Sequence, residues 1–133
     1  MKKVDTIVAT AIAALMALAA SSALGASAEG VWVTQPDKKG GFAHIQAHSC
    51  GAALCGTVLR AFDSEGREIT TPNVGKRVFW DMRPVADGRY KGRAWVPAHG
   101  REYDGVMKVS GDRMKVSGCL GPVCQSQTWR RVK

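Results

Sequence analysis

Hydrophobic and polar residues alternate over most of the chain after residue 28, in short runs separated by glycine-containing or charged turns. The run 42–48 alternates strictly, and the segments on either side of Gly111-Asp112 each place their apolar residues on one face. A period of two is typical of half-buried antiparallel strands. No segment beyond residue 28 keeps a helical period for more than about two turns. The pattern therefore predicts an all-β domain.

The runs predict about eight strands, separated mostly by short turns. The exception is the polar segment 63–76, which we expect to be the one long loop. Within the run 77–82, alternation predicts that Val78, Trp80 and Met82 share a face. Short strands at this spacing predict a sandwich or a closed barrel, and an eight-stranded barrel is either filled by side chains or holds one small ligand. The expected strands are 30–34, 42–48, 54–62, 77–82, 89–96, 103–110, 113–118 and 125–132.

The first 28 residues follow a different pattern, with a basic start at residues 1–3 and an almost continuous apolar run over 7–20. Ala26-Ser27-Ala28 then supplies small residues at the two positions that a signal peptidase reads. We therefore expect residues 1–28 to be a secretory signal peptide cleaved after Ala28. Residues 29–133 would form one domain in the periplasm or outside the cell. The alternative is a membrane anchor; after cleavage the domain would not be an integral membrane protein.

The four cysteines form two pairs with equal spacing, each flanking a predicted turn. In an oxidising compartment such cysteines form disulfides, and four of them allow three connectivities. Local pairing, Cys50 with Cys55 and Cys119 with Cys124, is favoured because it needs no assumption about the tertiary fold. A four-cysteine zinc site is the alternative, although the spacing fits structural zinc only loosely.

Basic residues exceed acidic ones, with 19 Lys and Arg against 11 Asp and Glu among 133 residues. Arg89, Lys91 and Arg93 alternate along one predicted strand and would form a basic stripe on one face. Outside the cytoplasm the anionic partners are envelope lipids and cell-wall polymers, and no nucleic acid is expected. The alternative is a soluble surface that happens to be basic.

The sequence predicts no catalytic centre, metal site or cofactor. It contains no nucleophile elbow, zinc-protease motif or phosphate-binding loop, and no acid–base pair emerges from the spacing. His44 and His48 are about 13 Å apart along a strand, which is too far to share a metal ion. An enzyme is therefore the least favoured class of function.

Several short motifs along the domain, in their order and spacing, resemble domain-of-unknown-function family 2147, a group of exported bacterial proteins. The resemblance covers nearly all of residues 30–132. It implies a small closed antiparallel barrel similar to lipocalins, with no established activity and no agreed catalytic residues. The motifs are Gly30-x-Trp32, Cys55-Gly56, Tyr103-Asp104-Gly105, Gly118-Cys119 and Gln127-Thr128-Trp129-Arg130.

Gly30-x-Trp32 also resembles the first-strand signature of lipocalins, in which the tryptophan plugs one barrel end beneath a basic side chain. The resemblance implies that Arg130 or Arg131 packs over Trp32 through a cation–π contact. The domain is much shorter than a lipocalin, so any cavity should be modest.

Aromatic residues are the candidate ligand contacts. Trp80 or Trp95, together with Tyr90 and Tyr103, would line a mouth that stacks a flat or apolar ligand, unless these side chains only pack the core. The sequence thus predicts a non-enzymatic binder of a small apolar or amphipathic ligand. The alternative is an interaction or inhibitor module that uses the basic stripe and the 63–76 loop to bind an envelope protein or an anionic envelope polymer.

Overall fold

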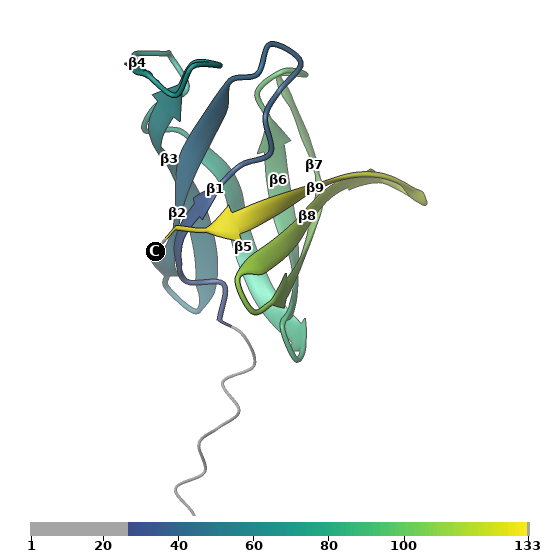
Figure 1. Ribbon diagram of the computed structural model, residues 1–133. Coiled ribbons are helices and arrows are strands. Elements are labelled where there is room, and N and C mark those ends of the chain that lie inside the picture. The colour runs from purple at the N-terminus through teal and green to yellow at the C-terminus, as the bar shows by residue number, and fades with distance from the viewer. Residues whose placement is uncertain (1–26, 133) are drawn as a thin grey trace, which may run out of the picture.

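The computed structural model describes residues 27–132, which form an all-β barrel (Figure 1). The predicted signal peptide lies almost entirely outside these residues. Within them, no helix has the length and apolar character needed to cross a membrane. The strands are β1 (Gly30–Val33), β2 (Phe42–Cys50), β3 (Ala53–Phe62), β4 (Glu68–Ile69), β5 (Arg77–Ala86), β6 (Arg89–Val96), β7 (Arg101–Ser110), β8 (Arg113–Leu120) and β9 (Val123–Arg131).

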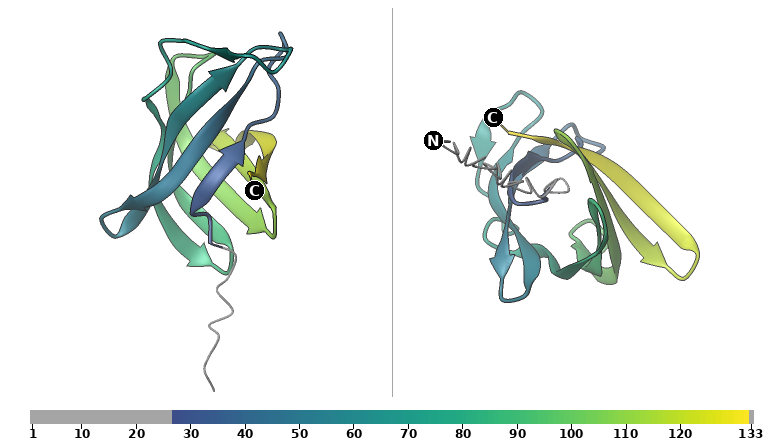
Figure 2. Two further views of the ribbon diagram at one scale, coloured as in Figure 1. Left: turned by 60° about the vertical axis from the view of Figure 1, so that its left-hand side comes forward. Right: turned by 90° about the horizontal axis from the view of Figure 1, so that it is seen from below.

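The strands are antiparallel throughout and close into a ring. Their order is β2-β1-β9-β8-β7-β6-β5-β3-β4, and a further pairing of β2 with β3 completes the barrel. Figure 2 shows this ring from one end, with the β8–β9 hairpin extending away from it. The two-residue strand β4 lies in the expected long loop and pairs only with the end of β3. The expected closed barrel of eight strands is therefore confirmed.

Large apolar side chains fill the barrel interior. Two glycines make room for them: a Cβ on Gly56 would overlap the Phe79 ring, and a Cβ on Gly105 would overlap the Met82 methyl group. Removing each large side chain from water stabilises the fold by about 1.5–3 kcal/mol, so a filled interior suits a small domain. The largest fully buried side chains are Trp32, Phe79, Ile45, Met82, Met107 and Met114.

One expected strand face is wrong. Phe79 and Met82 are both fully buried, whereas Trp80 is half-buried. The strand register shifts between Trp80 and Arg83, and Asp81 adopts a φ of 52°. An inserted residue of this kind reverses the alternation of faces beyond it, so Met82 lies on the inner face with Phe79 and does not share the face of Trp80.

Both disulfides join neighbouring cysteines across hairpin turns. Cys50 pairs with Cys55 at the β2–β3 turn, and Cys119 pairs with Cys124 at the β8–β9 turn. These are the local pairings that the sequence favoured. The second disulfide closes the projecting end of the β8–β9 hairpin, which is therefore covalently fixed even though it lies outside the barrel wall.

Candidate functional groove

One hollow on this barrel lies on its outer side, where β1 separates from β9. These two strands pair at only two positions, Trp32 with Arg131 and Val33 with Arg130. Beyond Val33 the chain leaves the barrel wall, and a groove of about 620 Å³ opens between this segment and the β8–β9 hairpin. Its lining residues are Val33, Thr34, Gln35, Pro36, Phe42, Arg113, Thr128 and Arg130.

One side of the groove is apolar and firmly placed. The Phe42 ring stacks on Phe62 with centroids 5.0 Å apart, and Val33 and Pro36 complete this side. The side-chain oxygen of Gln35 accepts a hydrogen bond of 3.2 Å from the backbone N–H of Thr128. The segment after β1 is thereby tied to β9, so the groove has walls on both sides.

The opposite side carries two arginines that face each other across neighbouring strands. Arg113 on β8 and Arg130 on β9 are direct Cα partners, and both are exposed. Within residues 27–132 neither forms an ion pair with a carboxylate. Like charges placed directly opposite each other destabilise a sheet. This pair therefore does not contribute to the stability of the fold.

Further exposed cations continue across the same barrel wall. The register places Arg89 opposite Lys108, and Lys108 opposite Lys115, in one row over β6, β7 and β8. In the part of the chain that the structure describes, these three side chains form no ion pairs. The outer surface beside the groove is thus strongly basic.

The predicted stripe along β6 is less uniform than its sequence suggests. Arg93 forms ion pairs with Asp104 and Glu102 on β7, so its charge is largely balanced. Arg89 and Lys91 are exposed. The free positive charge on β6 is therefore that of Arg89 and Lys91, and from Arg89 it continues across the strands to Lys108 and Lys115.

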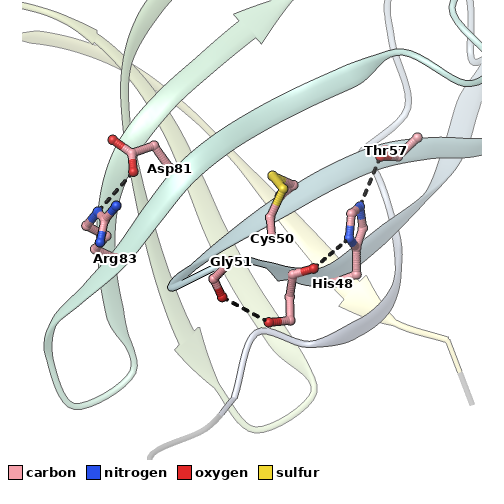
Figure 3. The surroundings of a disulfide bond; sticks show 8 residues. His48, Cys50, Gly51, Thr57, Asp81 and Arg83 are labelled. Atoms are coloured by element: carbon pink, nitrogen blue, oxygen red, sulfur yellow. Dashed lines mark hydrogen bonds and ion pairs between the residues drawn. A yellow bond between two sulfur atoms is a disulfide. The ribbon is translucent and has the colours of Figure 1, made fainter.

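The second hollow, of about 230 Å³, lies at one end of the barrel. The turn that holds the Cys50–Cys55 disulfide forms one side of it, and Figure 3 shows this turn with Gly51 beside the disulfide. His48 on β2 points toward Thr57, with its Nε2 atom 3.2 Å from the threonine hydroxyl (Figure 3). Leu54, Met82 and Tyr90 border the hollow from the barrel side.

At this end of the barrel, Trp32 is covered by an arginine. The Arg131 guanidinium carbon lies 4.3 Å from the centroid of the indole ring. Its Nη1 atom donates a hydrogen bond of 2.7 Å to the carbonyl of Glu29. Arg130, the other candidate, lies in the groove instead. Gly30 has a φ of 127°, and a Cβ there would come within 3.0 Å of Arg131 Nη1, so glycine allows this close packing.

The four candidate aromatic residues have separate surroundings. Tyr90 borders the end hollow, whereas Trp80 lies under Arg77 and Trp95 under Lys76. On β6, Trp95 follows Ala94, whose cross-strand partner is Tyr103. Because neighbouring residues on a strand point to opposite faces, Trp95 and Tyr103 do not line one mouth. The structure does not gather the four into a single site.

The histidines are also dispersed. His44 lies against the Phe62 ring, and His99 Nδ1 is 2.8 Å from the Tyr103 hydroxyl. Burial, together with the charge of Arg60, lowers the pKa of His44 below its usual value. Among residues 27–132 there is no group of three or more histidine, cysteine or acidic side chains that would hold a metal ion.

The long loop 63–76 is held by local hydrogen bonds. The Asp63 carboxylate accepts bonds from the backbone N–H groups of Arg67 and Glu65, and these contacts lower the pKa of Asp63. Farther along, Val58 on β3 donates to the carbonyl of Lys76 and accepts a bond from the N–H of Gly75. The loop is therefore part of the barrel edge.

The sequence did contain a signal for the facing arginines. Gly121-Pro122 is a two-residue turn whose position is fixed by the Cys119–Cys124 disulfide. Counting back equally along both strands from this turn brings Arg113 opposite Arg130. No sequence pattern of this kind marks the apolar side of the groove. That side depends on where β1 stops pairing with β9.

Comparisons with known proteins agree with this architecture. A protein named in its description as HP1028 from the human pathogen Helicobacter pylori, belonging to the lipocalin family, superposes with a TM-score of 0.63. The match covers 80% of this chain and 84% of that one at 14% sequence identity, so the likeness is one of fold. No curated protein matches the sequence. The model of DUF2147, described as an uncharacterized protein conserved in bacteria, matches residues 30–131, and the chain therefore belongs to this family.

Proposed function

We propose that this protein is an exported, non-enzymatic binder of a small amphipathic molecule with an anionic head group, held in the groove between β1 and the β8–β9 hairpin. The observation that carries this proposal is the facing pair Arg113 and Arg130. A cross-strand pair of like charges with no acidic partner makes the fold less stable. An anionic ligand between the two guanidinium groups would offset their repulsion, because each group would then be attracted to the ligand.

The groove suits such a ligand in size and chemistry. Its volume of about 620 Å³ lies within the usual range for small-molecule sites. Guanidinium groups bind carboxylate or phosphate oxygens in a planar, paired geometry, and such charge-assisted hydrogen bonds are strong. The apolar side formed by Val33, Pro36 and Phe42 would accept a short hydrocarbon tail.

Two further observations support the proposal. The lipocalin-like fold is compatible with small-ligand binding, and the filled interior favours a site on the surface over one inside the barrel. The two disulfides suggest an oxidising compartment outside the cytoplasm. Export through the predicted signal peptide would place the protein there.

The test is a titration of the disulfide-bonded protein with decanoate and with decyl phosphate, followed by NMR and calorimetry. Decanol, which has the same tail without a charge, is the ligand control. We expect saturable shifts at groove residues with the anions and none with decanol. Arg113→Gln and Arg130→Gln should each weaken binding about 10- to 100-fold, the loss of one charged hydrogen bond.

The matched protein control is Arg89→Gln, which removes one charge from the same barrel wall outside the groove. Binding that survives both groove substitutions, or that Arg89→Gln reduces equally, would contradict a specific site. Equal binding of decanol would show that the arginines play no part.

A second candidate function has its own observation, the row Arg89, Lys108 and Lys115. These exposed cations would bind an anionic envelope surface or polymer instead of a single small molecule. Sedimentation with phosphatidylglycerol vesicles separates the two functions. Vesicle binding lost in a variant with all three residues changed to glutamine, but kept in Arg113→Gln, would favour this candidate.

A further inference from the structure

The first described residues close one end of the barrel. Ala28 has no exposed surface, and its carbonyl oxygen accepts a buried hydrogen bond of 2.8 Å from Trp32 Nε1. Its backbone N–H group points to the Tyr90 hydroxyl oxygen at 3.4 Å. Ala28 thus belongs to the same core cluster as Trp32.

Arg131 holds the residues on both sides of Ala28. Its Nη1 atom donates to the Glu29 carbonyl at 2.7 Å, and its Nη2 atom donates to the Ser27 carbonyl at 2.9 Å. The same guanidinium lies over the Trp32 ring. Residues 27–29 are therefore fixed by three side chains from three different strands.

Cleavage after Ala28, which the small-residue pattern predicts, would dismantle this arrangement. It would remove the acceptor of Trp32 Nε1 and one of the two carbonyls held by Arg131. The new amino group of Glu29 would lie near the lost carbonyls. Like the indole N–H it is a hydrogen-bond donor, so it cannot act as the acceptor that Trp32 Nε1 loses. A buried donor would be left unpaired beside a new positive charge, which native proteins avoid.

We propose that the signal peptidase cuts upstream of Ser27, so that Ser27 and Ala28 stay in the mature protein as the plug of this barrel end. The sequence offers suitable positions there: Ala23-Leu24-Gly25 has small residues at both places that the peptidase reads. Arg113 and Arg130 take no part in these contacts, so the groove does not depend on where the cut falls.

The first test is the natural amino terminus. The full-length precursor is expressed in a Gram-negative host, the protein is recovered from the periplasm by osmotic shock, and its first residue is read by Edman sequencing and intact mass. A first residue at or before Ser27 is the expected result. A chain that starts at Ala28, at Glu29 or later would overturn the proposal. An uncut chain would overturn both the proposal and the predicted export.

The second test asks whether the plug matters to the fold. Two proteins are secreted behind the same unrelated signal peptide, one starting at Ser27 and one at Glu29. The shorter chain should melt at least about 4–8 °C lower, and its tryptophan emission should shift to longer wavelength as Trp32 meets water. Equal melting temperatures with equal emission spectra would overturn the reasoning.

Discussion

Replacing either groove arginine with glutamine should stabilise the barrel. Arg113 and Arg130 are direct cross-strand partners, both exposed and both without an acidic partner in the described chain. Two like charges about 7 Å apart in water repel each other by about 0.6 kcal/mol. Salt at physiological strength reduces this repulsion, because the screening length is then about 8 Å.

The two substitutions should not add. Either one removes the whole repulsion, so each single variant should gain about 0.5 kcal/mol in unfolding free energy at low salt, and the double variant should gain no more from this source. A gain of that size raises the melting temperature of such a domain by roughly 2–4 °C. The assay is thermal and urea unfolding of Arg113→Gln, Arg130→Gln and the double variant, at salt concentrations of about 0.01 M and about 1 M.

The control is Arg83→Gln, which also lowers the net charge by one. Arg83 donates a hydrogen bond of 2.9 Å to Asp81, so this change should not stabilise the protein. The reasoning is refuted if Arg113→Gln and Arg130→Gln both destabilise the barrel. It is equally refuted if their gains add in the double variant and persist at high salt. The first result would mean that the arginines have structural partners, and the second that the gain does not come from repulsion between their charges.

Three further changes test other parts of the structure. Gly56→Ala should lower stability by about 1–3 kcal/mol in urea unfolding, because its methyl group would overlap the buried Phe79 ring; an unchanged midpoint would contradict this. Because the pKa of His44 is lowered in the fold, the unfolded chain binds protons first as pH falls below about 6.5, so the barrel loses stability there. In His44→Gln the melting temperature should fall less between pH 7.5 and 5.5 than it does in the native protein. An unaltered pH dependence would mean that another group causes the loss of stability. Replacing Cys119 and Cys124 together with serine should lower the free energy of unfolding by about 2 kcal/mol, the value expected for so short a loop. An unchanged unfolding midpoint would show that this disulfide does not stabilise the fold.

Much of the fold could be predicted from the sequence because it follows from local rules. Alternation and turn residues give the hairpin of β7 and β8, in which Ser110 pairs with Arg113 across Gly111-Asp112. The same rules fail on β5. The bulge at Asp81 is not signalled by a glycine or proline, and it places Met82 on the buried face of Phe79 and not on the face of Trp80.

The candidate site was harder to predict because it depends on how separate strands meet. Aromatic content pointed to Trp80, Tyr90, Trp95 and Tyr103, but which faces they occupy depends on register and on the β5 bulge. The groove lies where β1 stops pairing with β9 after two residue pairs. How far these two strands pair depends on how the whole barrel closes, so no local sequence pattern near Val33 predicts where they separate.

The filled interior and the outer groove have one physical origin. A domain of this size needs nearly all of its apolar volume as core, and here Trp32, Phe79 and the buried methionines occupy it. A ligand site would then have to lie where the barrel wall leaves a hollow without emptying the core, and the wall leaves such a hollow beside Val33. At that place the chain also sets Arg113 against Arg130, against the ordinary rule for cross-strand pairs. Departures of this kind, with no compensating contact in the fold, are expected at functional sites. For that reason the groove is a better candidate than the barrel end, where every polar contact around Trp32 already serves the structure.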